Sequence, residues 1–214
     1  MIKAVIFDMD GLMIDSERVT FECYQEVLKD MNLTMDVEFY KTLLGKTIHG
    51  IYDLFYKEYG NDFPIDSVIG KVHELMANRF EVEGVPLKKG LIELLTYLKE
   101  NNYKTIVATS SNRARVDTIL KQANITHYFD DSICGDEVAK GKPNPEVFLK
   151  SCQKLGVNTD EAIVLEDSEA GIQASYSANI KVICIPDMKY PEETYANMTH
   201  LILDDLSKVI EYLK

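Results

Sequence analysis

The hydrophobic positions of this chain follow two alternating patterns. Short apolar runs rich in β-branched residues lie at residues 3–7, 103–108, 162–165 and 180–185, with weaker runs at 132–134 and 200–203. Runs of this kind predict strands buried on both faces, as in a parallel sheet. Apolar side chains recur at helical spacing between them, at residues 91–100, 114–123, 145–155, 168–177 and 206–213. The alternation predicts an α/β fold with a doubly wound, Rossmann-like parallel sheet.

Residues 16–84 break this alternation. The segment contains no convincing strand, and its apolar positions predict four amphipathic helices near residues 17–31, 37–44, 48–59 and 65–82. Gly45, Gly60 and Pro64 separate the helical stretches. We therefore expect an inserted all-α domain at residues 16–84 and a core formed by residues 1–15 and 85–214.

Composition excludes several classes of partner. The 214 residues carry 35 acidic and 23 basic side chains, a formal net charge of -12 that repels nucleic acid and anionic lipid. No apolar stretch approaches the roughly 20 residues that span a bilayer, and no signal peptide is evident. The four cysteines form no C-x-x-C pair, which favours reduced thiols. We expect a cytoplasmic monomer that binds neither nucleic acid nor membrane.

Polar clusters follow four of the predicted strands. They are Asp8 and Asp10 before Gly11, then Thr109-Ser110-Ser111, then Lys142 in G-K-P-N-P, then Glu166-Asp167. Ligands of open α/β sheets bind outside the carboxyl ends of the strands, so these side chains should meet at one edge. Together they supply candidates for a metal site, a nucleophile, hydroxyl donors and a cation.

Four motifs carry a resemblance to a known family. F-D-M-D-G at 7–11, A-T-S-S at 108–111, K-P-N-P at 142–145 and L-E-D-S-E-A-G at 165–171 resemble the haloacid dehalogenase-like hydrolases. Their order and spacing match over the whole chain, and the helical insertion resembles that family's small cap. The subgroup it resembles most contains β-phosphoglucomutase and the sugar-phosphate phosphatases.

The resemblance implies a mechanism that suits the residues. Asp8 would attack phosphorus and form an aspartyl phosphate, while Asp10 would protonate the leaving oxygen and then deprotonate water. The metal ligands would be Asp8, Asp10 through its backbone carbonyl, Asp167 and Glu166, although Glu166 could equally orient another ligand. Thr109 would bind phosphoryl oxygens and Lys142 would offset negative charge. The expected cofactor is Mg²⁺.

A second group of residues is expected to contact the rest of the substrate. It consists of Ser110, Ser111, Asn112, Arg113, Lys46 and Lys71. Of these, Lys46, Lys71 and the segment 111–113 should affect substrate choice and the Michaelis constant more than the chemistry.

The reaction itself has alternatives. Asp10 favours phosphate ester chemistry, because dehalogenases and phosphonate-cleaving relatives lack a second aspartate. The mutase subgroup has a cap histidine and arginine where this chain has Thr20 and Ile48. In the mutases the cap arginine binds the non-reacting phosphate of the substrate. Other cations could bind that phosphate here, namely Lys46, Lys71, Arg79 or Arg113. We expect a phosphoric monoester hydrolase acting on a small phosphorylated metabolite, a sugar phosphate, with a β-phosphoglucomutase-type phosphomutase as the alternative.

A non-enzymatic phospho-acceptor module, such as a receiver domain, also has an early acidic pair. The helical insertion and the separate Glu166-Asp167 pair argue against it.

Overall fold

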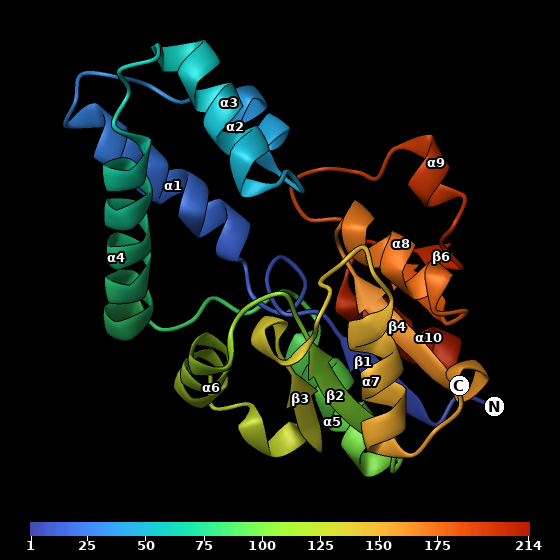
Figure 1. The fold of residues 1–214 in the computed structure, drawn as a ribbon. Coiled ribbons are helices and arrows are strands. Elements are labelled where there is room, and N and C mark those ends of the chain that lie inside the picture. Colours follow the sequence, from blue (N-terminus) through green and yellow to red (C-terminus); the bar gives the residue numbers. More distant parts are fainter. The chain divides into compact units, whose positions relative to one another are not determined.

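The computed structural model describes residues 1–214 and divides into two compact units. One unit consists of Met1–Asp15 together with Val85–Lys214, and the other of Ser16–Gly84 (Figure 1).

The first unit is built on a six-stranded parallel sheet. Its strands are β1 (Ala4–Phe7), β2 (Lys104–Ala108), β3 (Asp131–Ile133), β4 (Ala162–Glu166), β5 (Lys181–Cys184) and β6 (Leu201–Ile202). They lie in the order β3-β2-β1-β4-β5-β6. All six predicted strands are present, and the predicted doubly wound α/β fold is confirmed. The order reverses at β1, which therefore marks the switch point where such sheets bind ligands.

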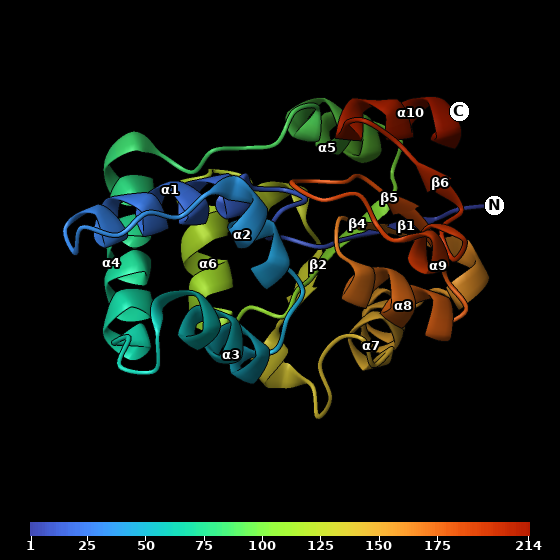
Figure 2. The ribbon, with the colours of Figure 1, turned by 90° about the horizontal axis from the view of Figure 1, so that it is seen from above.

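Helices cover both faces of this sheet. They are α5 (Leu91–Glu100), α6 (Arg113–Gln122), α7 (Glu146–Leu155), α8 (Glu169–Ser177), α9 (Glu193–Ala196) and α10 (Val209–Leu213). Figure 2 shows α5 and α10 on one side of the sheet and α7 and α8 on the other. The strand β1 is buried on both faces, with Ala4 and Ile6 packed in the cluster beneath α7 and α8. Each fully buried large aliphatic side chain contributes about 1.5–3 kcal/mol, so this two-sided burial fixes β1 firmly in place.

Short helical pieces were not predicted. They are η1 (Thr126–Tyr128), η2 (Gly135–Glu137) and η3 (Thr159–Glu161), together with α9; a further short piece, η4 (Leu206–Lys208), lies within a predicted helix. Three or four residues are too few for a hydrophobic period to show. The helix predicted at 206–213 is divided between η4 and α10. No helix in the structure is both long and apolar enough to cross a membrane.

The second unit is entirely helical. It contains α1 (Ser16–Lys29), α2 (Val37–Leu43), α3 (Ile48–Tyr59) and α4 (Ile65–Glu83), close to the four predicted ranges. Its core is aromatic: the fully buried Phe55 stacks on Phe63 with centroids 5.5 Å apart and meets Phe39 edge-on. Asp36 caps α2 by accepting a hydrogen bond from the Phe39 backbone, which explains why that helix starts at Val37.

The chain segments that flank the helical unit pair with each other inside the first unit. The Asp15 amide donates to the Pro86 carbonyl at 2.9 Å, and the Lys88 amide donates to Met13 at 2.9 Å. The Lys88 ammonium also lies 2.5 Å from Asp187 in the loop after β5. The two chain segments that flank the helical unit are thus held at the edge of the sheet where β1 ends.

Asp205 fixes the C-terminal segment to the start of α5. Its carboxylate accepts hydrogen bonds from the Lys89 ammonium at 2.7 Å and from the Ser207 amide at 3.0 Å. The hydrogen bond from Lys89, followed by that from the Ser207 hydroxyl, lowers the pKa of Asp205 to about 2. Because this folded-state pKa lies below the ordinary value of 3.8, Asp205 stabilises the fold fully above that value. This contribution is lost as the pH falls toward the folded-state pKa.

Asp205→Ala should therefore lower the unfolding free energy at neutral pH by about 1 kcal/mol, the usual effect of losing a capping carboxylate. The difference from wild type should shrink as the pH falls below about 4. Urea denaturation across this pH range measures both effects. Asp204→Ala is the matched control, since Asp204 is its exposed neighbour and should change little. An Asp205→Ala difference that stays constant down to low pH would contradict the assignment.

Candidate active site

A buried lysine joins two acids at the carboxyl edge of the sheet. Lys142 lies in the loop before α7, and its Nζ is 2.5 Å from Asp8 Oδ1 and 2.5 Å from Glu166 Oε1. Its side chain is only 5% exposed, and the ammonium also lies 5.0 Å from the centroid of the Phe148 ring. Asp8 follows β1 and Glu166 ends β4, and these strands are paired in register. The sheet therefore brings together three of the residues predicted from the motifs.

Burial and the neighbouring charges both shift the pKa values in this group. Burial raises the pKa of Asp8 to about 8; the charge of Lys142 opposes this effect, and that of Glu166 adds to it. Burial alone would lower the pKa of Lys142, but the charges of Asp8 and Glu166 outweigh it and raise that pKa. Lys142 is therefore a permanent cation, and an additional cation beside Asp8 would favour its ionised form.

Three carboxylates lie close enough together to hold a metal ion. One oxygen from each of Asp8, Glu166 and Asp167 falls within a group whose members are all within 4.8 Å of one another. A donor set made only of oxygens suits hard cations such as Mg²⁺ or Ca²⁺. Gly11 belongs to the same arrangement, because it has φ +81° and a Cβ there would overlap the Asp167 carboxylate. The loop after β1 thus needs glycine to approach Asp167. The three carboxylates together fit a divalent cation.

Glu166 is fully buried and has hydrogen bonds on both oxygens. Besides Lys142 on Oε1, its Oε2 accepts from the amides of Asp167 and Ser168 at 3.0 and 2.9 Å, and from the Ser168 hydroxyl at 2.9 Å. The Ser168 hydroxyl also accepts from the Gly171 amide, which caps α8. A Cβ at Gly171 would overlap the Glu166 carboxylate. The motif at 165–171 therefore packs the first turn of a helix directly against a buried acid.

The loop after β2 lies beside Asp10. Thr109 is 2% exposed, its amide donates to the Ile133 carbonyl, and its hydroxyl accepts from the Ser111 amide at 3.1 Å. The Ser111 hydroxyl donates to Asp10 Oδ2 at 2.7 Å. Ser110 is exposed. The structure thus brings Ser111 to the acidic loop, as the sequence predicted for this cluster, with Thr109 supporting the turn.

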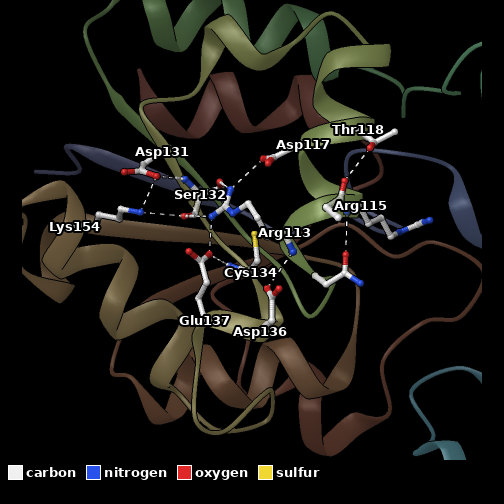
Figure 3. A network of polar contacts seen from close by, with 12 residues as sticks. Arg113, Arg115, Asp117, Thr118, Asp131, Ser132, Cys134, Asp136, Glu137 and Lys154 are labelled. Atoms are coloured by element: carbon white, nitrogen blue, oxygen red, sulfur yellow. Dashed lines mark hydrogen bonds and ion pairs between the residues drawn. The ribbon is translucent and has the colours of Figure 1, made fainter.

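Asn112 and Arg113 have clear partners within the protein. Asn112 caps α6 by accepting from the Arg115 amide at 2.9 Å. The Arg113 guanidinium contacts the Ser132 hydroxyl at 2.5 Å and Glu137 at 2.6 Å, so that it joins α6 to β3 and η2 (Figure 3). These contacts give both side chains a structural role. Their predicted contact with substrate stays a prediction.

Arg115 was not singled out from the sequence. Its Nη2 lies 2.7 Å from Asp10 Oδ1. Successive helical residues are about 100° apart, so Arg113 and Arg115 point to different sides of α6. The R-x-R spacing at the start of a helix next to the A-T-S-S motif was the available signal. Lys46 and Lys71, the remaining predicted substrate contacts, belong to the helical unit, where both are exposed.

The fold and the acidic edge define an α/β protein with a candidate metal site at the switch point of its sheet, and comparison with known proteins identifies its family. Residues 5–185 match the haloacid dehalogenase-like hydrolases, and the chain belongs to that family.

Similar proteins include the phosphorylated carbohydrates phosphatase of Thermotoga maritima, which is 29% identical over 85% of this chain and 83% of its own length. Protein CbbY of Rhodobacter capsulatus is 31% identical over 86% of each chain. A solved Thermotoga maritima structure, provisionally assigned as a β-phosphoglucomutase, superposes with a TM-score of 0.83 at 25% identity and covers 99% of this chain and 98% of its own. A relative named as a phosphatase agrees with the prediction of a phosphoric monoester hydrolase.

The tight packing of Gly171 gives a test of the site's architecture. Gly171→Ala should destabilise the protein by about 1–3 kcal/mol, because the added methyl group must displace the buried Glu166 carboxylate or the start of α8. Gly70→Ala is the matched control, since Gly70 is also helical but has no atom within 4 Å of the added Cβ. That change should be neutral or stabilising by up to about 1 kcal/mol.

Denaturant unfolding of both variants measures the difference. If Gly171→Ala proved as stable as Gly70→Ala, the close packing of α8 against Glu166 would be wrong.

Proposed function

We propose that this protein is a Mg²⁺-dependent phosphatase that hydrolyses a small phosphorylated metabolite through an aspartyl phosphate on Asp8. The observation that carries the proposal is the position of Asp8. Its carboxylate lies at the switch point of the sheet, beside the buried ammonium of Lys142 and within the acidic group that includes Asp167. A carboxylate nucleophile needs such a surrounding, because the incoming phosphate is itself negatively charged.

In the first half of the reaction, a carboxylate oxygen of Asp8 attacks phosphorus. The bond from phosphorus to the leaving oxygen breaks, and Asp10 supplies the proton that the leaving oxygen takes. Lys142 stays beside Asp8 and offsets the charge that gathers there. Thr109, Ser110, Ser111 and the neighbouring amides are proposed to bind the phosphoryl oxygens and the adjoining part of the substrate.

In the second half, water attacks the aspartyl phosphate. Asp10 takes the proton from this water, and Asp8 leaves as a free carboxylate. Covalent catalysis is useful here because it divides the very slow hydrolysis of a phosphate monoester into two easier steps.

Asp8, Asp167 and the backbone carbonyl of Asp10 would hold Mg²⁺. When bound, this ion supplies positive charge that neutralises phosphoryl oxygens and orients them for in-line attack. Glu166 has both oxygens occupied by Lys142 and by the loop before α8, so we assign it the role of holding Lys142.

The relatives support the proposed substrate class. One of them is named as a phosphatase of phosphorylated carbohydrates, which supports a sugar phosphate. Cytoplasmic location and a monomeric state belong to the same proposal. So do the role of residues 16–84 as a cap and the contact of Lys46 and Lys71 with substrate.

A phosphomutase is the second candidate, favoured by the likeness to the structure assigned as a β-phosphoglucomutase. Two positions argue against it. The Thr20 hydroxyl donates to the Ser16 carbonyl of its own helix at 2.8 Å, and Ile48 is an exposed apolar residue. Neither supplies the cation that would grip a second phosphate.

The nucleophile is tested with p-nitrophenyl phosphate. The wild type should release phosphate in Mg²⁺ and stop in excess chelator, and Asp8→Asn should abolish turnover, since losing a nucleophile costs several orders of magnitude. Asp160→Asn, which changes an exposed aspartate of η3, should leave activity unchanged. Both variants should unfold cooperatively like the wild type. Activity of Asp8→Asn above about a hundredth of the wild-type rate would rule out Asp8 as the nucleophile.

The choice between hydrolysis and isomerisation is tested by phosphorus NMR. The substrate is β-glucose 1-phosphate with a trace of the 1,6-bisphosphate. Inorganic phosphate should appear faster than glucose 6-phosphate, because water reaches the aspartyl phosphate and no cation at positions 20 or 48 retains a bisphosphate. Asp8→Asn should give neither product. Glucose 6-phosphate forming much faster than inorganic phosphate would make the protein a mutase.

A further inference from the structure

The carboxylate of Asp10 is held on both oxygens. Arg115 Nη2 lies 2.7 Å from Oδ1, and the Ser111 hydroxyl donates to Oδ2 at 2.7 Å. Both donors come from the segment that follows β2, whereas Asp10 follows β1. Two hydrogen bonds from fixed directions determine the rotation of the carboxylate as well as its position.

The backbone that carries Arg115 is itself anchored. Its amide donates to the capping side chain of Asn112 at 2.9 Å. Two residues earlier, Arg113 ties the same helical turn to Ser132 and Glu137 (Figure 3). On the other side, the Ser111 amide is held by Thr109. The two groups that hold Asp10 therefore project from a rigid turn, as precise positioning requires.

Two cations pair with the carboxylates at this edge of the sheet. Lys142 pairs with Asp8 and Glu166, and Arg115 pairs with Asp10. The side chains of Arg115 and Asp10 are 30% and 26% exposed, and ion pairs near the surface contribute about 0–1 kcal/mol to stability. The contact is therefore too weak to serve mainly as a fold element.

We propose that Arg115 is a positioning residue that orients Asp10 for hydrolysis of the aspartyl phosphate; this inference rests on the function proposed above. In that step the oxygen of water forms a bond to phosphorus and one proton of water passes to the Asp10 carboxylate. The bond from phosphorus to Asp8 breaks, its electron pair returns to the Asp8 carboxylate, and inorganic phosphate is the product. The hydrogen bonds on both oxygens fix the direction in which the Asp10 carboxylate points.

This role predicts an unequal effect on the two halves of the reaction. With p-nitrophenyl phosphate, the leaving group departs without a proton, so formation of the aspartyl phosphate does not depend on the orientation of Asp10. Breakdown of the intermediate does depend on it. A variant without the guanidinium should therefore form the intermediate normally and accumulate it.

The experiment compares wild type with Arg115→Met, Arg115→Lys and Lys121→Met in Mg²⁺ with p-nitrophenyl phosphate. Rapid acid quenching measures the fraction of enzyme present as aspartyl phosphate. Arg115→Met should lower kcat by about 10- to 100-fold, in line with the loss of a group that orients a catalytic residue. It should leave kcat/KM nearly unchanged, and the trapped intermediate should rise. Arg115→Lys should recover part of kcat, and Lys121→Met, which changes an exposed cation of the same helix, should match wild type.

The outcomes separate this inference from the function on which it rests. If wild type neither turns over nor forms an aspartyl phosphate, the proposed function is wrong. If wild type is active and Arg115→Met retains its kcat, or loses kcat and kcat/KM equally without accumulating intermediate, Arg115 does not position Asp10 for hydrolysis. Thermal unfolding of both arginine variants shows whether they are folded, and Arg115→Lys provides the comparison if Arg115→Met is not.

Discussion

Lys142 forms the interaction on which the site depends, because it is a buried cation between two buried carboxylates. Each of Asp8, Lys142 and Glu166 would be costly to bury alone; Lys142 stabilises both carboxylates and is stabilised by both, whereas the two carboxylates repel each other. The three come from different parts of the chain, so their contact requires β1 and β4 to be paired and the loop before α7 to cross their ends. Removing one partner would leave a buried charge uncompensated.

Glycine makes this crowded arrangement possible. At Gly11 the loop after β1 passes beside Asp167, and at Gly171 the first turn of α8 presses against Glu166. In both places a methyl group would occupy the space of a carboxylate oxygen. Acidic groups can therefore gather within a few ångströms of each other, where a divalent cation would balance their repulsion.

Two nearby arginines in the first turn of α6 have different roles. Arg113 points toward β3 and η2 and fastens the helix, and Arg115 points toward Asp10. The same segment provides the Asn112 cap and the Ser111 hydroxyl. Stability and positioning thus come from adjacent residues, since helical geometry separates their side chains by direction.

The sequence by itself determined the strands, most helices, the insertion and the polar clusters, because burial imposes a periodic pattern that can be read along the chain. It also indicated the family, since the four motifs keep their order and spacing. The partner of each side chain was decided only by the tertiary structure. The sequence predicted that Asn112 and Arg113 contact substrate, and only the structure shows their contacts within the protein. The R-x-R spacing did not reveal that Arg115 contacts Asp10. The contact of Arg115 with Asp10 joins residues 105 positions apart, and only the packing of helix α6 against the sheet edge fixes which way each side chain points.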